Sequence, residues 1–157
     1  MNEPIDVIDA AAGLAPGMPL HAARRFRPVA LQGSQASHDA LLFDPVPGLS
    51  PADRLRVAAA CCDAVQASAL AAHYRALLSA PARTAEAPSP ALPAMLRWAL
   101  LITTAPRDGD RAALHALREA GLADPAIVAL AQLVGFLSYQ TRLVAGLQAL
   151  AAAGGVR

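Results

Sequence analysis

The sequence predicts an all-α protein. Alanine and leucine dominate, arginine and glutamine are frequent, and β-branched residues are few, which favours helix. No segment shows the sustained alternation of apolar and polar residues that marks a strand. Apolar types make up 55% of the 157 residues, enough for one domain with a hydrophobic core. We therefore expect one compact domain of six to seven helices.

The first part of the chain predicts three helices. They cover the segments IDVIDAAAGL, PLHAARRFR and ALQGSQASHDALLF. Gly13 stands near the end of the first segment and Pro28 stops the second, as glycine and proline commonly do at helix ends. We treat residues 1–29 as an N-terminal helical extension and residues 30–157 as the main helical domain.

The next helix has a strong start signal. Ser50 can accept a hydrogen bond as the N-cap, Pro51 suits the first helical position, and Asp53 lies in the positive first turn. A second helical segment, SALAAHYRALLSA, follows and ends at Pro81. The sequence leaves open whether the two segments form one helix or break near Gln66.

The rest of the chain predicts one loop followed by three helices. Four prolines in the thirteen residues PARTAEAPSPALP predict an exposed loop over 81–93. AMLRWALLITTAP is expected to be helical, and DRAALHALREAG is expected to start at Asp110 and stop at Gly121. The last helix is expected to begin with Asp124 as its cap, and its long apolar run predicts the central buried helix.

Charge and hydropathy limit the partners and the location. All thirteen basic residues are arginine, the net charge is +1, and no basic stripe is present, so we expect no nucleic-acid partner. The acidic start has no basic segment before an apolar core, which predicts no signal peptide and a cytoplasmic location. The uncharged run 125–141 ends at Arg142 and is short for a membrane span, so we expect no membrane partner.

The low charge also bears on assembly. Charged types make up only 16% of the residues, so much apolar surface needs a cover. We expect a second copy of the chain to supply it, in a homo-oligomer that is a dimer, trimer or hexamer.

The only two cysteines, Cys61 and Cys62, are adjacent. Neighbours on a helix point about 100° apart, so the two thiols cannot bridge each other while both are helical. A reactive thiol needs a lowered pKa, and a position in the middle of a helix gets no help from the helix dipole. We therefore interpret both as buried structural residues.

The histidines show no metal-binding pattern. They lie far apart in the sequence, without a His-Glu-x-x-His motif or a Cys-x-x-Cys motif, at His21, His38, His73 and His115. No glycine-rich loop follows a strand, as a dinucleotide site would need. We expect no metal and no cofactor.

Tyr139 and Arg142 are three residues apart and share a face of the last helix. An arginine in an apolar helix either has a structural partner or borders a pocket that binds an anion. His73, flanked by alanines, is by itself more often a core histidine than a catalyst.

The order of these segments resembles a known superfamily. LSPADRLRVAAACCDAV, SALAAHYRALL and LADPAIVALAQLVGFLSYQTRLVAGLQAL follow each other as the corresponding helices do in the alkylhydroperoxidase D-like (AhpD-like), carboxymuconolactone decarboxylase (CMD) superfamily. The resemblance covers roughly residues 30 to 152 and looks nearest to the branch often called CMD domain proteins. It implies an all-α, oligomeric AhpD-like domain.

The resemblance also shows a departure at the family's redox motif. The peroxidase branch carries Cys-x-x-Cys-x-x-x-His on its second helix. With His73 on the family histidine, the two cysteine positions fall on Gln66 and Ala69. The glutamate of the peroxidase proton relay falls near Arg54, beside Asp53. Members without the cysteine pair include decarboxylases that act on small carboxylated molecules.

Three functions follow as expectations. The first is a superfamily protein without an intact dithiol peroxidase centre, which binds or converts a small carboxylated metabolite by acid–base chemistry. His73 would be the acid or base, with Arg142 as the anion anchor and Tyr139 as a polar pocket group. The second is a peroxidase-related antioxidant activity that uses Cys61 or Cys62. The third is a non-catalytic helical oligomerisation subunit, so the sequence leaves open whether the chain is an enzyme.

Overall fold

The computed structural model describes residues 6–154, and every regular element within them is helical, which confirms the predicted fold class. The α-helices are α1 (Val7–Ala12), α2 (Pro19–Arg24), α3 (Pro28–Phe43), α4 (Pro51–Ala64), α5 (Ser68–Leu78), α6 (Pro81–Thr84), α7 (Leu92–Thr104), α8 (Arg111–Glu119) and α9 (Asp124–Ala152). A short 3-10 segment, η1 (Pro106–Asp108), joins α7 to α8.

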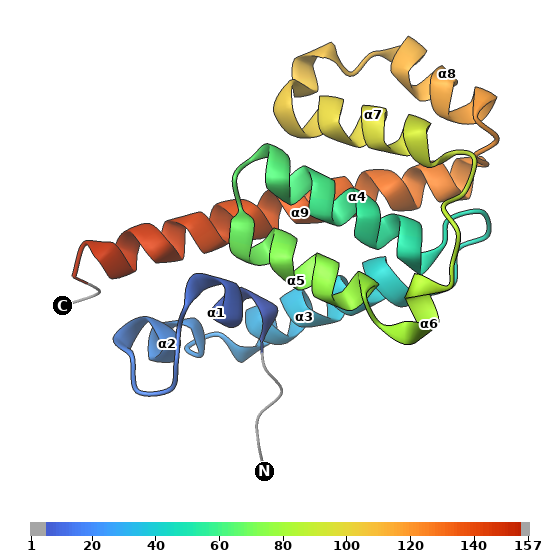
Figure 1. The fold of residues 1–157 in the computed structure, drawn as a ribbon. Helices are drawn as coiled ribbons and strands as arrows, with labels where there is room; N and C mark the ends of the chain where they lie inside the picture. The colour runs from blue at the N-terminus through green and yellow to red at the C-terminus, as the bar shows by residue number, and fades with distance from the viewer. Residues whose placement is uncertain (1–5, 155–157) are drawn as a thin grey trace.

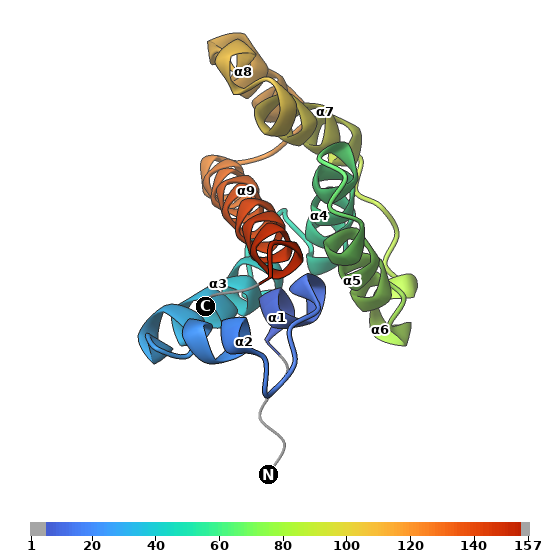
Figure 2. The ribbon, with the colours of Figure 1, turned by 90° about the vertical axis from the view of Figure 1, so that its left-hand side faces the viewer.

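Helix α9 runs through the middle of the molecule, as predicted from its apolar run. Its 29 residues span about 43 Å at 1.5 Å per residue. It packs against α1, α3, α4, α7 and α8. Figure 2 shows α9 nearly end-on, with the N-terminal helices on one side, the α4–α5 pair on a second and the α7–α8 pair on a third. A single long helix therefore holds three groups of shorter helices together (Figure 1).

By length and composition α9 could cross a membrane, with a mean hydropathy of 1.3, and it is the one helix of residues 6–154 that meets this test. The core helix of a globular protein passes the same test. Here 39% of its most apolar stretch is buried against the other helices.

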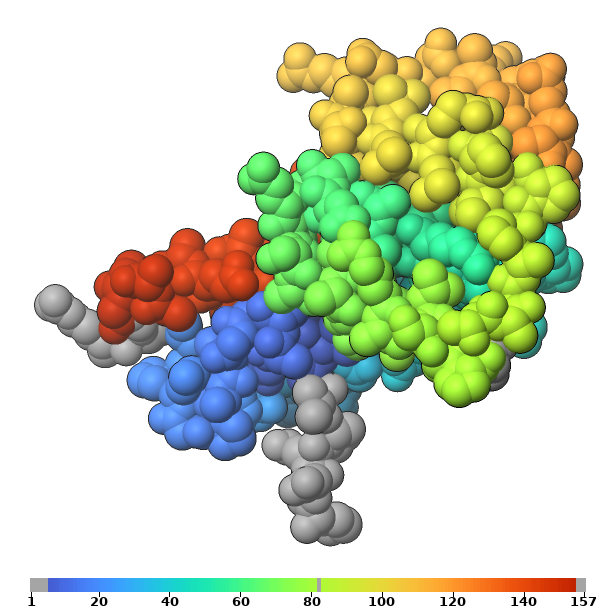
Figure 3. Space-filling view, in the orientation of Figure 1, coloured from blue at the N-terminus to red at the C-terminus, as the bar shows by residue number. Residues whose placement is uncertain are grey.

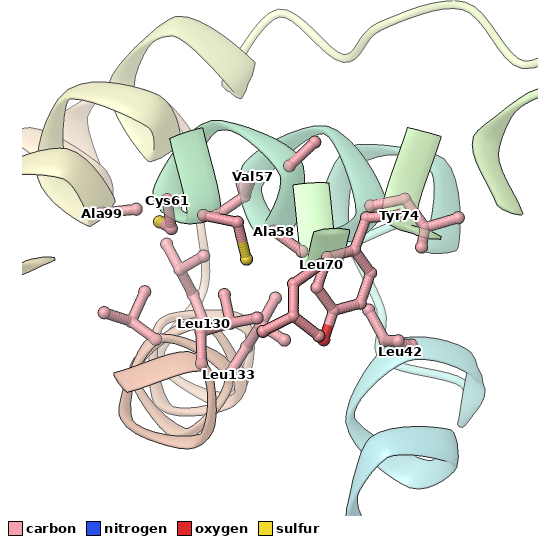
Figure 4. Close-up of a cluster of buried hydrophobic side chains, with 14 of the residues drawn as sticks. Leu42, Val57, Ala58, Cys61, Leu70, Tyr74, Ala99, Leu130 and Leu133 are labelled. Atoms are coloured by element: carbon pink, nitrogen blue, oxygen red, sulfur yellow. The ribbon is translucent and has the colours of Figure 1, made fainter. Parts of the chain in front are cut away.

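The hydrophobic core forms where α4 crosses α9. Figure 4 shows side chains from α3, α4, α5, α7 and α9 meeting there; its labels mark Leu42, Val57, Ala58, Cys61, Leu70, Tyr74, Ala99, Leu130 and Leu133. Most of them are less than 3% exposed. Each fully buried leucine contributes about 1.5–3 kcal/mol relative to an exposed one. This contact region fixes how α4 and α5 lie against α9.

Several predicted helix boundaries are confirmed by their capping bonds. The Ser50 hydroxyl accepts a hydrogen bond from the Asp53 amide at 3.1 Å, with Pro51 as the first helical residue. The Asp110 carboxylate accepts one from the Ala113 amide at 2.9 Å. Gly13 ends α1 in the left-handed conformation, with φ of 71°.

The expected cap of α9 is wrong by one residue. Asp124 is itself the first helical residue, and Ala123 holds the extended cap conformation without a side-chain bond. The Asp124 carboxylate instead accepts a hydrogen bond from Arg118 Nε at 2.8 Å. This contact ties the end of α8 to the start of α9.

The proline-rich segment is not a loop throughout, which corrects the expectation for 81–93. Its first four residues form α6, because proline at the first helical position loses no backbone bond. Its last residues belong to α7, which starts at Leu92 with Pro93 in the first turn. Because α6 is a separate helix and α4 is separate from α5, the described part of the chain has more helices than the expected six to seven.

The break between α4 and α5 lies at Gln66. Gln66 has φ of 60°, and it is the only non-glycine residue with positive φ in the described part of the chain. Its amide donates to the Asp63 carbonyl and the Ala67 amide to the Cys62 carbonyl, both at 2.9 Å. This is the Schellman arrangement, in which glycine usually holds the left-handed position. It folds α4 and α5 into the antiparallel pair of Figure 1.

Helices α1 and α2 are joined by buried charges. Arg24 Nη1 donates to Asp6 Oδ1 at 2.7 Å and also to Asp9 Oδ1, and Arg25 Nη1 donates to Asp9 Oδ2 at 2.8 Å. Burial lowers the pKa of Arg24, but the hydrogen bonds and charges of Asp6 and Asp9 outweigh burial, and the net pKa is raised. We call Asp6, Asp9, Arg24 and Arg25 the N-terminal ion cluster.

Candidate functional site

A cavity of about 320 Å³ lies where the α4–α5 turn meets the end of α7 and the second half of α9. In Figure 3 this turn is the green surface nearest the exposed part of α9, drawn in red. The lining residues are Cys61, Val65, Gln66, Ala67, Ser68, Ala69, Leu70, Thr103, Leu137, Ser138, Thr141, Arg142, Val144, Ala145 and Gln148. We call this space the turn cavity.

The lining is apolar with a few hydrogen-bonding groups and one charge. Leu70, Leu137 and Val144 supply buried apolar wall. Amide and hydroxyl side chains come from Gln66, Ser68, Thr103, Ser138, Thr141 and Gln148. Among the described residues that line the cavity, Arg142 alone is charged. Such a composition suits a small molecule with an apolar body and one anionic group.

Arg142 has no protein partner among residues 6–154. No carboxylate of the described residues lies within ion-pair distance of its guanidinium, whereas Arg75, for example, pairs with Asp63. Arg142 projects from the exposed side of α9 at the wall of the turn cavity. Its five donors are therefore available to an anion in the cavity.

The two cysteines differ in where they face. Both are buried and neither forms a disulfide, as predicted. Cys61 lines the turn cavity; burial raises the pKa of its thiol, and the Thr103 hydroxyl lowers it by a smaller amount. Cys62 is fully buried, and burial together with the neighbouring Cys61 and Asp63 charges raises its pKa to about 12. Neither thiol carries appreciable thiolate at neutral pH.

The positions that the resemblance assigns to the missing cysteine pair do lie at the cavity. Gln66, in the turn, and Ala69, in the first turn of α5, both line it. Neither side chain has thiol chemistry. At the start of α5, the cavity wall thus carries the Gln66 amide and the Ala69 methyl group at the positions where the resemblance would place two thiols.

The structure does not gather the three predicted site residues around one space. Arg142 lines the turn cavity, whereas His73 and Tyr139 are not among its lining residues. Tyr139 is 47% exposed, and its ring lies 6.1 Å from that of Phe136. His73 lies on the α5 side that faces α3.

There His73 meets a second histidine, which sequence reasoning missed. His73 Nε2 and His38 Nε2 are 3.2 Å apart, and His38 Nδ1 is 2.8 Å from Asp39 Oδ1. Burial lowers the pKa of His73, and the His38 charge lowers it further. The two histidines are 35 residues apart on different helices, so no sequence spacing could indicate the pair. We call His38, Asp39 and His73 the histidine cluster.

Asp53 and Arg54, near the position that the resemblance gives to the relay glutamate, stabilise the packing of neighbouring segments. Arg54 is 1% exposed, and its guanidinium donates to the Leu41 carbonyl at 2.9 Å and the Asp44 carbonyl at 2.6 Å, which holds the end of α3. Asp53 accepts hydrogen bonds from Arg56 at 2.8 Å and from the Ser89 amide at 3.2 Å. Neither residue lines the turn cavity.

In the part of the chain that the structure describes, no three His, Cys, Asp or Glu side chains converge on one point. A metal with three such ligands from a single copy therefore has no site among these residues.

Comparison with known proteins identifies the fold. No family model and no curated protein sequence matches the chain. Among solved structures it is similar to an uncharacterized peroxidase-related protein from Silicibacter sp. TM1040, at 21% identity and a TM-score of 0.63, over 96% of this chain and 80% of that chain. It is also similar to an uncharacterized peroxidase-related protein from Ralstonia eutropha JMP134, described as an alkylhydroperoxidase AhpD core, at 24% identity and a TM-score of 0.55, over 88% of this chain and 78% of that chain.

At these identities the likeness establishes the fold and no activity. The chain thus has the helical fold of peroxidase-related proteins with an AhpD core.

Proposed function

We propose that this chain is an AhpD-like/CMD superfamily protein without an intact dithiol peroxidase centre, and that its turn cavity binds a small carboxylated molecule. The shared fold and the order of the motifs support the superfamily. One observation carries the ligand class: Arg142, without a carboxylate partner in the described residues, stands at the wall of an otherwise uncharged cavity.

Binding has more support than conversion. The described lining residues include no carboxylate or imidazole that could transfer a proton at the cavity. A carboxylate held by Arg142 would have Ser138 nearby on the same helix as a further hydrogen-bond donor, whereas the Thr141 hydroxyl donates to the Leu137 carbonyl at 2.9 Å. The apolar residues Leu70, Leu137 and Val144 would cover the rest of the molecule. About 320 Å³ is at the small end of ligand pockets, which suits a metabolite of modest size.

The test compares carboxylic acids with their amides, and a variant of Arg142 with a variant of an arginine outside the cavity. Short aliphatic and aromatic carboxylates, and the amides of the same acids, are titrated into the full chain by calorimetry and thermal shift. The carboxylates should bind and the amides should not. Arg142→Gln should weaken carboxylate binding by about 10–100-fold, because a hydrogen bond to a charged group contributes about 1.5–3 kcal/mol.

Arg97→Gln is the control, since Arg97 is an exposed arginine of α7 that does not line the cavity. It should bind like the wild type. Equal binding of acids and amides, or equal loss in both arginine variants, would exclude the proposal.

The peroxidase alternative has one point in its favour, which is that Cys61 lines the cavity. The raised pKa of both thiols weighs against it, because the thiolate is the nucleophile. Peroxide consumption with a thiol reductant, measured in the wild type and in a Cys61→Ser/Cys62→Ser variant, decides the matter. A lower rate of peroxide consumption in the double variant than in the wild type would support the peroxidase alternative.

A further inference from the structure

The histidine cluster brings two imidazole nitrogens from different helices close together. His38 Nε2, from α3, and His73 Nε2, from α5, face each other at 3.2 Å. Two imidazole nitrogens that bind one ion at about 2.0–2.1 Å with a tetrahedral angle lie about 3.3 Å apart. The two nitrogens thus stand close to the separation that a shared ion requires.

A neighbouring carboxylate orients the first imidazole. Asp39 Oδ1 lies 2.8 Å from His38 Nδ1, so the Nδ1–H donates to the carboxylate and Nε2 keeps its lone pair. That lone pair points toward His73. A carboxylate behind a ligating histidine is the usual outer partner at zinc sites, where it fixes the tautomer and makes the ligand more basic.

Packing holds the His38 ring, while the other two residues of the cluster are more exposed. His38 is 4% exposed, and its ring stacks on Tyr74 with centroids 6.0 Å apart and planes 21° apart. Tyr74 is in turn held by its hydrogen bond to Gln140. His73 is half-buried, and Asp39 is largely exposed, so the cluster is reachable from solvent. Water can fill the coordination positions that the protein does not.

We propose that His38 and His73 bind one divalent transition-metal ion through their Nε2 atoms, with Asp39 as the outer carboxylate and water as the remaining ligands. Imidazole ligands suit zinc, nickel and copper. The site is separate from the turn cavity, because neither histidine lines that space. This proposal therefore does not depend on the proposed function.

The experiment is a titration of the full, tag-free chain with Zn²⁺ at pH 7.5, followed by calorimetry and by thermal unfolding. One ion should bind per chain, and saturating Zn²⁺ should raise the unfolding temperature by several degrees, since the ion binds the folded site. His73→Ala and His38→Gln should abolish this binding. Asp39→Asn should weaken it by about 10–100-fold while keeping the stoichiometry.

Two controls separate this site from other histidines and from the cavity. His115 is exposed on α8 beside Glu119, so His115→Ala removes a histidine without touching the cluster and should bind as the wild type does. Arg142→Gln should also bind Zn²⁺ normally. Equal binding by His73→Ala and the wild type, or an Asp39→Asn variant with unchanged affinity, would overturn the proposal.

A measurement on the unmodified chain covers the case in which a variant does not fold. In nitrogen–proton NMR spectra of the histidine rings, one equivalent of Zn²⁺ should shift the His38 and His73 signals together. It should leave those of His21 and His115 in place. Shifts confined to His21 or His115, or no shift at all, would mean that the pair is only hydrogen-bonded and that the proposal is wrong.

Discussion

Arg24 in the N-terminal ion cluster and Arg142 at the turn cavity differ in burial and in charge partners. In the N-terminal ion cluster, the Arg24 side chain is 11% exposed, and its charge is met by Asp6 and Asp9. At the turn cavity, Arg142 is exposed to an uncharged space and has no carboxylate partner among residues 6–154. The first arginine holds two helices together, whereas the second makes no such contact within the described residues. A charge that the fold does not use is the better candidate for a ligand contact.

Arg24→Gln should produce the largest loss of stability. It leaves Asp6 and Asp9 buried without their main cation, and removal of one partner from a buried ion pair costs about 3–5 kcal/mol. Urea unfolding monitored by circular dichroism would measure the change. A loss below about 1 kcal/mol would mean that the N-terminal ion cluster is solvated, and the contrast with Arg142 would disappear.

Alkaline pH should destabilise the core through Cys62. The folded pKa of about 12 lies above the ordinary thiol value, so above about pH 9 the unfolded chain releases a proton that the folded chain keeps. The stability that the buried, protonated Cys62 thiol gives the folded state is therefore fully present below about pH 9. It is lost as the pH rises from about 9 toward 12. Burial also raises the pKa of Tyr74, which acts in the same direction.

The measurement is the free energy of unfolding under reducing conditions at pH 7, 9 and 10, for the wild type and Cys62→Ala. The difference between the two should shrink as the pH rises. A difference that stays constant with pH would show that Cys62 titrates alike in both states.

Gln66→Gly should stabilise the protein by about 0.5–1 kcal/mol. A side chain in the left-handed region costs about 1–2 kcal/mol, and the greater freedom of glycine in the unfolded chain offsets part of the gain. Denaturant unfolding checks the sign. Gly121, which already has positive φ after α8, offers the matched control Gly121→Ala, which should destabilise. If Gln66→Gly lowers stability, the Gln66 side chain makes a contact that outweighs the backbone cost.

Arg142→Gln should change stability least, by less than about 0.5 kcal/mol, because an exposed arginine without a partner contributes little to the fold. The same denaturant experiment measures it beside Arg24→Gln. A loss of several kcal/mol would give Arg142 a structural role and would weaken the case for an anion at the cavity.

Local signals in the sequence predicted much of the fold. Ser50, Asp110 and Gly13 act within a single turn, so their capping roles could be predicted from neighbouring residues. The apolar run of the last helix predicted its central place for the same reason. The sequence left a break near Gln66 open and could not decide for it, since a glutamine in the left-handed position depends on how α4 and α5 pack and not on its own preference.

The candidate site was predicted only in part. Arg142 could be found because a cation interrupts an apolar run, and Gln66 and Ala69 because the resemblance points to them. The pairing of His38 with His73, and that of Arg24 with Asp6 and Asp9, joins different helices. Contacts of this kind arise only when the helices pack. The sequence therefore pointed to Arg142, which lines the cavity, but could not place His73 beside His38.

The position of α9 in the chain also has a consequence for biosynthesis. Helix α9 is made after α1, α3, α4, α7 and α8, which pack against it, and the Gln148 side chain donates a hydrogen bond to the Ala11 carbonyl, 137 residues earlier. Until α9 leaves the ribosome, the apolar faces of α1, α3, α4 and α7 lack the surface that buries them. The contacts of α9 with these helices can therefore form only after all of them have been made.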